Sequence, residues 1–306
     1  MKIGILGYGS IGKRHAGNVQ TLGHKVNAYD PVGQIDGICT PERAKVIDWA
    51  DAIIVASPSA HHVIDFHDAA VEGKHILVEK PFAYDGPIGV LHNILKAARL
   101  IKENTIIATG FNLRFHSCVQ EVKKLMDKRY IGDPVCASFT VNQLSSKPVY
   151  LRDGIIRNWL SHEIDLAHFL LGDGTVESCV APIDELGYDS KEAFLGMKFD
   201  NVRDKVFVQG DYYTNPEQRF FWIEGTDASL YVNLIRREVY AKHKKDNVPK
   251  MIFQGNDSFD DNYVSEMRAF IGSIHAEEHN PWLATAEDGI RAHTTVMEAR
   301  KKAGLE

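Results

Sequence analysis

The sequence predicts an N-terminal α/β domain with a parallel sheet and a C-terminal α+β domain built on a large, mainly antiparallel, open-faced sheet. At 306 residues the chain is longer than one hydrophobic core usually is. Up to residue 115, apolar strands alternate with helices, which is typical of a parallel sheet. Beyond it, several runs alternate apolar and polar residues, as in an antiparallel sheet with one covered face. We therefore divide the chain into residues 1–115 and 116–306.

The first thirty residues carry the clearest ligand-binding motif. An apolar strand leads into Gly7, Gly9 and Gly12, the spacing G-x-G-x-x-G, which opens a helix. Gly7 allows a tight turn, Gly9 lets a pyrophosphate approach the backbone, and Gly12 lets the helix lie close to the strand. Asp30 ends the next strand, where a carboxylate binds ribose hydroxyls and repels a 2′-phosphate. The motif predicts NAD rather than NADP, and the alternative is a glycine turn without a ligand.

Other strands of this domain also end in polar residues. Continuous apolar runs predict buried strands near residues 51–56, 75–79 and 105–109. Ser57, Lys80 and Asn112 follow these strands, and ligands bind outside the carboxyl edge of a parallel sheet. Between Asp30 and the first of these strands, only a short helix fits, at residues 41–49.

The second domain is predicted from four helices and a set of short strands. The helices are expected at 116–129, 159–171, 262–276 and 285–302, and the strands at 134–142, 176–183, 193–199, 205–213, 219–224, 228–234 and 237–242. Loops are expected at 150–158 and 242–250. Thr285 and Asp288 are placed to form a capping box. An uncovered sheet face predicts a homodimer or homotetramer formed through this domain.

Composition excludes several other classes of protein. A formal net charge of −6 does not suit a general nucleic-acid surface. No apolar run is long enough to span a membrane, and the first strand leaves no room for a signal peptide. The four scattered cysteines indicate reduced thiols, and we expect a cytoplasmic protein without a metal site.

Five motifs occur in an order that resembles one family. They are the glycine motif, Ser57-Pro58 with His62, Glu79-Lys80-Pro81, the segment 110–115, and a helix carrying His162 and Asp165. This order is similar to the glucose–fructose oxidoreductase / inositol dehydrogenase / rhizopine-catabolism (Gfo/Idh/MocA) family over essentially the whole chain. The resemblance implies a Rossmann domain, an open-sheet domain, and hydride transfer between NAD(P) and a hydroxyl carbon of a sugar, polyol or related ring.

The resemblance also implies residue roles. Lys80 matches the lysine near the nicotinamide and the reacting hydroxyl, and His162 matches the usual general acid/base. Asp165 matches the last acid of the pattern D-x-G-x-H-x-x-D, but Asn158 replaces its first Asp and Leu160 its Gly. Asn158 can hydrogen-bond but cannot carry charge. Either the proton relay differs, or the substrate hydroxyl is held differently.

These residue types suit oxidation of a secondary alcohol. The reaction needs a base within hydrogen-bond reach of the hydroxyl and a reacting carbon held against the nicotinamide. An imidazole with an unperturbed pKa of about 6.5 suits the base at position 162. An ammonium at Lys80 would stabilise a developing alkoxide. Without the resemblance, His162 is simply a polar residue at a helix start and Lys80 a solvated lysine.

The remaining candidates line the expected cofactor and substrate sites. The expected cofactor-binding residues are Gly7, Gly9, Ser10, Ile11, Gly12, Asp30, Ser57, Pro58, His62, Glu79, Lys80 and Asn112. The expected substrate-binding residues are Arg152, Arg157, Asn158, His162 and Asp165. Two arginines indicate an anionic substrate, such as a sugar acid or nucleotide-linked sugar, with ordinary surface arginines as the alternative.

We therefore expect an NAD-dependent dehydrogenase of a sugar, aminosugar, sugar acid or cyclic polyol. One alternative is a glycosidase of the same family that keeps NAD bound and uses transient oxidation to drive elimination. The other is a cofactor-binding regulator without turnover, which the loss of the family aspartate at Asn158 makes less remote.

Overall fold

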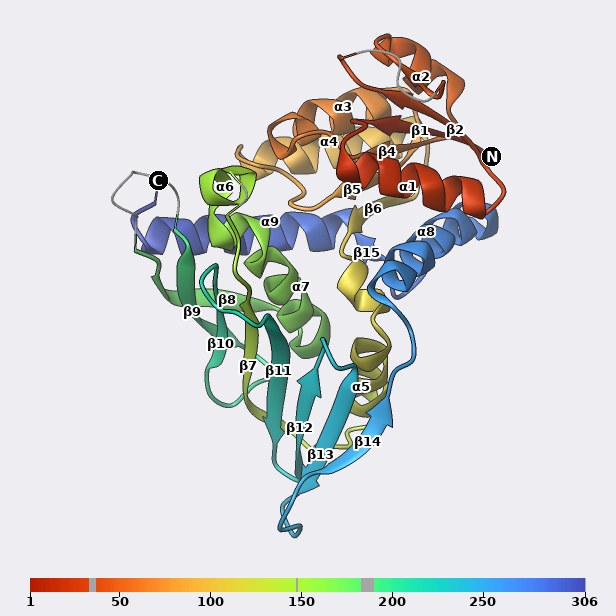
Figure 1. The fold of residues 1–306 in the computed structure, drawn as a ribbon. Helices are drawn as coiled ribbons and strands as arrows, with labels where there is room; N and C mark the ends of the chain where they lie inside the picture. Colours follow the sequence, from red (N-terminus) through yellow and green to blue (C-terminus); the bar gives the residue numbers. More distant parts are fainter. Residues whose placement is uncertain (33–36, 147, 183–189, 306) are drawn as a thin grey trace. The chain divides into compact units, whose positions relative to one another are not determined.

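The computed structural model describes residues 1–32, 37–146, 148–182 and 190–305 (Figure 1). It divides into two compact units, Met1–Phe115 with Phe259–Arg291, and His116–Ser258 with Ala292–Glu306. The division differs from the expected domain of residues 116–306, because residues 259–291 belong to the first unit. Within that unit, α8 (Phe259–Ala276) contacts α1 (Ser10–Thr21) and the 3₁₀ turn at Asn112–Phe115.

The first unit is built on a parallel sheet. In the described residues its strand order is β15-β6-β5-β4-β1-β2-β3. The strands are β1 (Lys2–Leu6), β2 (Lys25–Tyr29), β3 (Cys39–Thr40), β4 (Ala52–Val55), β5 (His75–Glu79), β6 (Ile107–Gly110) and β15 (Ala284–Thr285). All neighbours pair in parallel except β15, which is antiparallel to β6. Strands β3 and β15 were not predicted, because two-residue strands carry no periodic pattern.

Helices cover both faces of this sheet, which explains its continuous apolar strands. Side chains of α1 and α8 share a buried cluster with Ile3 and Ile5 on one face. The other face packs against α2 (Arg43–Trp49), α3 (His62–Val71), α4 (Ile88–Ile101) and the first residues of α9 (Ala286–Lys302). The loops that follow β1, β4, β5 and β6 all begin at the carboxyl edge of the sheet, because these strands are parallel.

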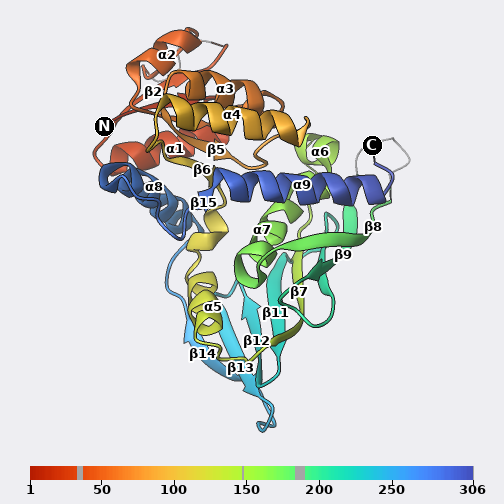
Figure 2. The ribbon, with the colours of Figure 1, turned by 180° about the vertical axis from the view of Figure 1, so that it is seen from behind.

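The second unit is built on a mainly antiparallel sheet (Figure 2). Its strand order in the described residues is β14-β13-β12-β11-β7-β10-β9-β8, and only β7 and β10 pair in parallel. The strands are β7 (Pro134–Asn142), β8 (Gly174–Val180), β9 (Glu192–Phe199), β10 (Val206–Asp211), β11 (Gln218–Gly225), β12 (Ala228–Asn233), β13 (Glu238–His243) and β14 (Lys250–Gln254). Strand β14 was not predicted; it begins at Lys250, the last residue of the expected loop 242–250.

The second unit holds α5 (Ser117–Asp127), α6 (Pro148–Asn158) and α7 (Leu160–Leu171), together with the part of α9 from Ala292 onward. The expected loop at 150–158 is wrong, because this segment is helical with a kink at Gly154, where φ is 71°. Helix α7 packs against β7 and β10. The position of Gly154 explains the error, since glycine at positive φ interrupts the helical pattern.

The opposite face of the second sheet carries partly exposed aromatic side chains. Phe220 and Tyr231 have ring centroids 5.8 Å apart, and Tyr231 and Tyr240 are 6.3 Å apart. Phe194 and Phe207 form a second contact at 5.2 Å. Phe194 is 44% exposed and Tyr231 is 40% exposed. We call these five residues the aromatic face.

The capping box predicted for the last helix is confirmed. The backbone N–H of Asp288 donates to Thr285 Oγ1 at 3.1 Å, and the N–H of Thr285 donates to the Asp288 carboxylate at 3.0 Å. These reciprocal bonds satisfy two backbone donors at the start of α9.

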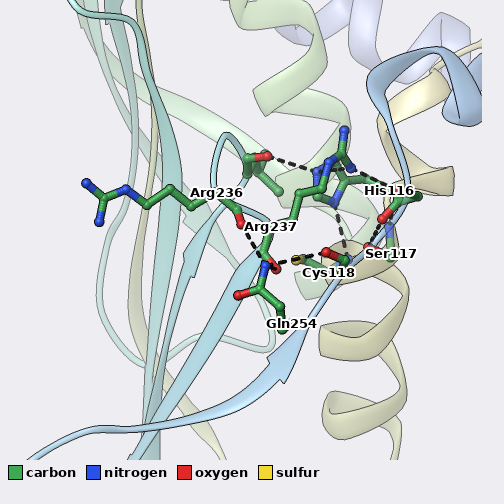
Figure 3. A network of polar contacts seen from close by, with 9 residues as sticks. His116, Ser117, Cys118, Arg236, Arg237 and Gln254 are labelled. Carbon is green, nitrogen blue, oxygen red and sulfur yellow. Dashed lines mark hydrogen bonds and ion pairs between the residues drawn. The ribbon is translucent and has the colours of Figure 1, made fainter.

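A buried polar network surrounds the start of α5 (Figure 3). The N–H of Cys118 donates to His116 Nδ1 at 3.2 Å, which leaves the ring proton on Nε2, 3.0 Å from the Leu234 carbonyl. Arg237 Nη1 lies 3.0 Å from the same Nε2 and donates to Asp257 at 2.8 Å. Burial, with the charge of Arg237, lowers the pKa of His116 to about 4. His116 is therefore a neutral helix cap at pH 7.

Candidate active site

The glycine turn leaves room for a ligand at one position only. A Cβ on Gly7, where φ is 98°, would lie 2.4 Å from Ser57 Cα. A Cβ on Gly12 would lie 2.0 Å from the carbonyl oxygen of Gly7. At Gly9, by contrast, an added Cβ would meet no atom within 4 Å. The backbone at Gly9 is thus open, beside the first N–H groups of α1, as binding of a dinucleotide pyrophosphate requires.

Asp30 lies beside this turn, at the end of β2. Its Oδ2 accepts from the N–H of Tyr8 at 3.3 Å, and its Oδ1 accepts from the N–H of Val32 at 3.0 Å. Two backbone bonds therefore fix the carboxylate next to the glycine motif. A fixed anion here fits ribose hydroxyls and disfavours a 2′-phosphate.

Ser57 and His62 connect the loop after β4 to the loop after β5. Ser57 Oγ donates to Asp65 at 2.5 Å, and Asp65 is paired with Arg43. The His62 ring is buried, with Nε2 2.9 Å from the Ser57 carbonyl and Nδ1 2.8 Å from the Pro81 carbonyl. Burial lowers the pKa of His62. The structure makes His62 an internal bridge, which differs from the direct cofactor contact that we expected.

Lys80 follows β5 directly, at the carboxyl edge of the sheet. Its backbone N–H donates to Glu79 Oε2 at 3.1 Å, and its bond to Pro81 is cis. The Glu79 side chain points inward and is bonded to His15 at 2.7 Å, which again differs from a direct cofactor contact. Lys80 is half-buried, whereas Glu79 is buried. In the Glu-Lys-Pro motif, Glu79 is therefore buried and bonded within the protein, and Lys80 is more accessible to solvent.

Asn112 completes the set in the first unit. It lies in the turn after β6 and is 1% exposed. Within the described residues, its Nδ2 has no hydrogen-bond partner. A buried amide donor without a protein acceptor is costly, so a ligand acceptor would satisfy it. With the open backbone at Gly9 and the carboxylate of Asp30, this amide fits a dinucleotide at the sheet edge.

The second unit places the expected acid/base residues at the start of α7. His162 is 9% exposed and Asp165 is 2% exposed, and their spacing of three puts them on one face of the helix. The backbone N–H of His162 donates to the Trp159 carbonyl at 3.0 Å. Asn158 is half-buried at the end of α6, and its carbonyl accepts from Ser161 Oγ at 3.1 Å. The three candidates thus share one helix junction.

A buried ion pair that the sequence did not predict lies next to His162 in the chain. Both Glu163 carboxylate oxygens accept from Arg219 of β11, at 2.7 and 3.1 Å. The Glu163 side chain is 2% exposed and that of Arg219 is 17% exposed. A glutamate beside buried apolar residues of a helix is a signal that could have predicted a buried partner. The pair ties the first turn of α7 to the sheet.

The two candidate arginines differ in their surroundings. Arg152 Nε donates to Asp153 at 2.8 Å, and the Arg152 side chain is 64% exposed. Arg157 is only 6% exposed. Arg152 therefore has a partner within the chain and gives little support to an anionic substrate, whereas Arg157 belongs to the buried end of α6.

Neither a metal cluster nor a membrane span is found in the described residues. Across residues 1–32, 37–146, 148–182 and 190–305, no group of three His, Cys, Asp or Glu side chains is arranged to hold a metal ion. None of the helices in this part of the chain combines the length and the hydropathy needed to cross a bilayer.

Comparison with known proteins defines the family. Residues 123–303, more than half of the chain, match the family described as "Oxidoreductase family, C-terminal alpha/beta domain". The chain therefore belongs to the Gfo/Idh/MocA oxidoreductase family, as the motif order predicted.

Relatives match over nearly the full length. An uncharacterized oxidoreductase of Bacillus subtilis is 26% identical, over 97% of this chain and 93% of the relative. A myo-inositol 2-dehydrogenase of Thermotoga maritima is 23% identical, over 98% of this chain and 96% of the relative. A solved levoglucosan dehydrogenase, in complex with NADH and levoglucosan, has a TM-score of 0.86 at 18% identity, covering 99% of this chain and 97% of its own. This structural likeness confirms the predicted fold.

Proposed function

We propose that this member of the family is an NAD-dependent dehydrogenase of a sugar or polyol, acting on a secondary hydroxyl group. The observation that carries the proposal is Lys80, held at the same carboxyl edge of the parallel sheet as the open backbone of Gly9. The names of the inositol and levoglucosan dehydrogenases support the same class of reaction.

The chain's own residues divide the work of this reaction. Gly9, Asp30 and Asn112 would bind the dinucleotide, which supplies the hydride acceptor when bound. The Lys80 ammonium would stabilise negative charge on the substrate oxygen. His162 would remove the hydroxyl proton as general base. Asn158, in place of the family aspartate, offers His162 no carboxylate from that position. Of the two acids in the family pattern, this chain keeps Asp165.

The substrate class remains the one expected from the sequence: a sugar, aminosugar, sugar acid or cyclic polyol. The Asp153 carboxylate beside Arg152 partly offsets one of the two positive charges that favoured an anion. We therefore rank neutral sugars and cyclic polyols before nucleotide-linked sugars.

Turnover across a substrate panel tests this proposal. We expect NADH formation with at least one neutral sugar or polyol, and a loss of kcat/KM of at least about 100-fold in Lys80→Ala and in His162→Ala. Exposed α4 residues supply matched controls, Lys96→Ala and His92→Ala, which should keep wild-type activity. Full activity in Lys80→Ala would contradict the proposed role. NAD binding without NADH release would instead indicate the glycosidase or the regulator.

We also propose that the aromatic face joins copies of this chain. Contiguous exposed aromatic side chains are typical of subunit interfaces. Tyr231→Glu should therefore convert a homodimer or homotetramer to smaller species in light scattering, whereas Lys96→Glu, on an exposed position of α4 in the first unit, should not. A wild-type monomer at micromolar concentration would contradict this assembly.

A further inference from the structure

The carboxylate of Glu79 is enclosed by three elements of the first unit. Its Oε1 lies 2.7 Å from His15 Nε2, on α1, and its Oε2 accepts from the backbone N–H of Lys80 at 3.1 Å. A Cβ added to Gly110, on β6, would lie only 3.1 Å from the carboxyl carbon. Glu79 is 7% exposed, so the carboxylate has almost no access to solvent. One anion thus connects the glycine-motif helix to the backbone of Lys80.

His15 has no other polar contact in the described residues. The side chain is 0% exposed, and its Nδ1 has no hydrogen-bond partner there. The ring of Tyr263, from α8, packs edge-on against it with centroids 6.1 Å apart. The buried His15 ring is therefore held by packing and by one hydrogen bond, and its polar partner among these residues is Glu79.

The charge state of Glu79 follows from these neighbours. Burial by itself raises the pKa of the Glu79 carboxyl, but the hydrogen bond and charge of His15 and the charge of Lys80 bring it below its usual value. The group is therefore an anion at pH 7, one residue before the proposed active lysine. Because the charges of Glu79 and Lys80 interact, a fixed anion at Glu79 stabilises a positive charge on the Lys80 side chain.

We propose that His15 and Glu79 form a positioning pair, which fixes the Lys80 backbone relative to the glycine-motif helix and maintains the Lys80 ammonium for catalysis. This inference rests on the proposed role of Lys80. Neither residue touches the substrate; both act through Lys80. Because α1 begins at the glycine turn, the pair also links the cofactor end of the site to the lysine.

A purely structural pair would behave differently. Breaking a buried ion pair lowers stability wherever it lies. It would change kcat and its pH dependence only if the pair controls a group that takes part in turnover. A structural role and a positioning role of the pair are therefore distinguished by kcat and its pH dependence, and not by the melting temperature.

The experiment compares four variants of the full-length chain in steady-state turnover with NAD. Glu79→Gln keeps hydrogen bonding but removes the charge, and His15→Leu removes the donor to Glu79. His15→Gln restores an N–H near the position of Nε2. Asp288→Asn weakens another ion pair of the same unit, to Arg114, and is the matched control.

We expect Glu79→Gln and His15→Leu to lower kcat by about 10- to 100-fold, with KM values within a few-fold of wild type. The alkaline limb of the kcat profile should move to lower pH in Glu79→Gln, because the anion that favours the ammonium is gone. His15→Gln should recover part of kcat. Asp288→Asn should lose stability but keep kcat and the pH profile.

Two results would overturn the inference, and they are distinguishable. If Glu79→Gln and His15→Leu keep kcat and the pH profile while Lys80→Ala is inactive, the pair has no positioning role and the proposed function stands. If Lys80→Ala itself keeps full activity, the proposed function fails and the inference fails with it.

Discussion

The ion pair between Glu163 and Arg219 makes a quantitative prediction about stability. The Glu163 side chain is 2% exposed and receives two hydrogen bonds from Arg219, at 2.7 and 3.1 Å. In Arg219→Met, this carboxylate is left buried without a partner, which typically costs about 3–5 kcal/mol. In Glu163→Gln the guanidinium remains 17% exposed and can reach water, so we expect a smaller loss of about 1–2 kcal/mol.

Urea unfolding measures both losses, and hydrogen exchange of the α7 amides shows where they act. Protection in the first turn of α7 should fall more in Arg219→Met than in Glu163→Gln. Lys205→Met breaks a solvent-exposed pair with Glu177 in the same unit and should change stability by no more than about 0.5 kcal/mol. The reasoning is refuted if Arg219→Met costs less than about 1 kcal/mol, or no more than Glu163→Gln.

Three further predictions concern the first unit and the start of α5. Asp30→Asn should reduce the preference for NAD over NADP by at least about tenfold in Kd, because the repulsion of a 2′-phosphate is lost; an unchanged ratio contradicts the assignment. Gly9→Ala should keep the melting temperature but weaken NAD binding, whereas Gly12→Ala, whose Cβ would meet backbone at 2.0 Å, should destabilise the fold; equal melting temperatures would show that the contact relaxes. His116 has a pKa of about 4 when folded, so its contribution to stability is complete above pH 6.5 and is lost as pH falls toward 4. This loss is on the order of 3 kcal/mol. In His116→Asn, the free energy of unfolding should depend less on pH between pH 6.5 and 4, as unfolding curves across that range would show.

The sequence was sufficient for the fold class because its signals are local. Apolar runs identified β1, β4, β5 and β6, and the capping residues Thr285 and Asp288 identified the start of α9. The errors arose where a single glycine or a distant partner decides the structure. Gly154 interrupts the sequence pattern of α6, which is a kinked helix. Strand β15 is defined by its pairing with β6, which no local pattern shows. Helix α8 joins the first unit through packing that no local pattern records.

The candidate site shows the same limit at the level of side chains. Motif order identified Glu79 and His62, but not where their polar atoms point. Both are buried and bonded within the protein, Glu79 to His15 and His62 to two backbone carbonyls. These contacts join residues far apart in the sequence, so they depend on the tertiary structure. The ion pair of Glu163 with Arg219 escaped prediction for the same reason.

Isotope transfer tests the central proposal most directly. The active substrate from the panel is prepared with deuterium on the reacting carbon and incubated with NAD and the wild-type protein or Lys80→Ala. We predict deuterium in the NADH released by the wild-type protein and little or none with Lys80→Ala. Substrate turnover without labelled NADH in solution, or equal labelling by Lys80→Ala, would contradict an NAD-dependent dehydrogenase that acts through Lys80.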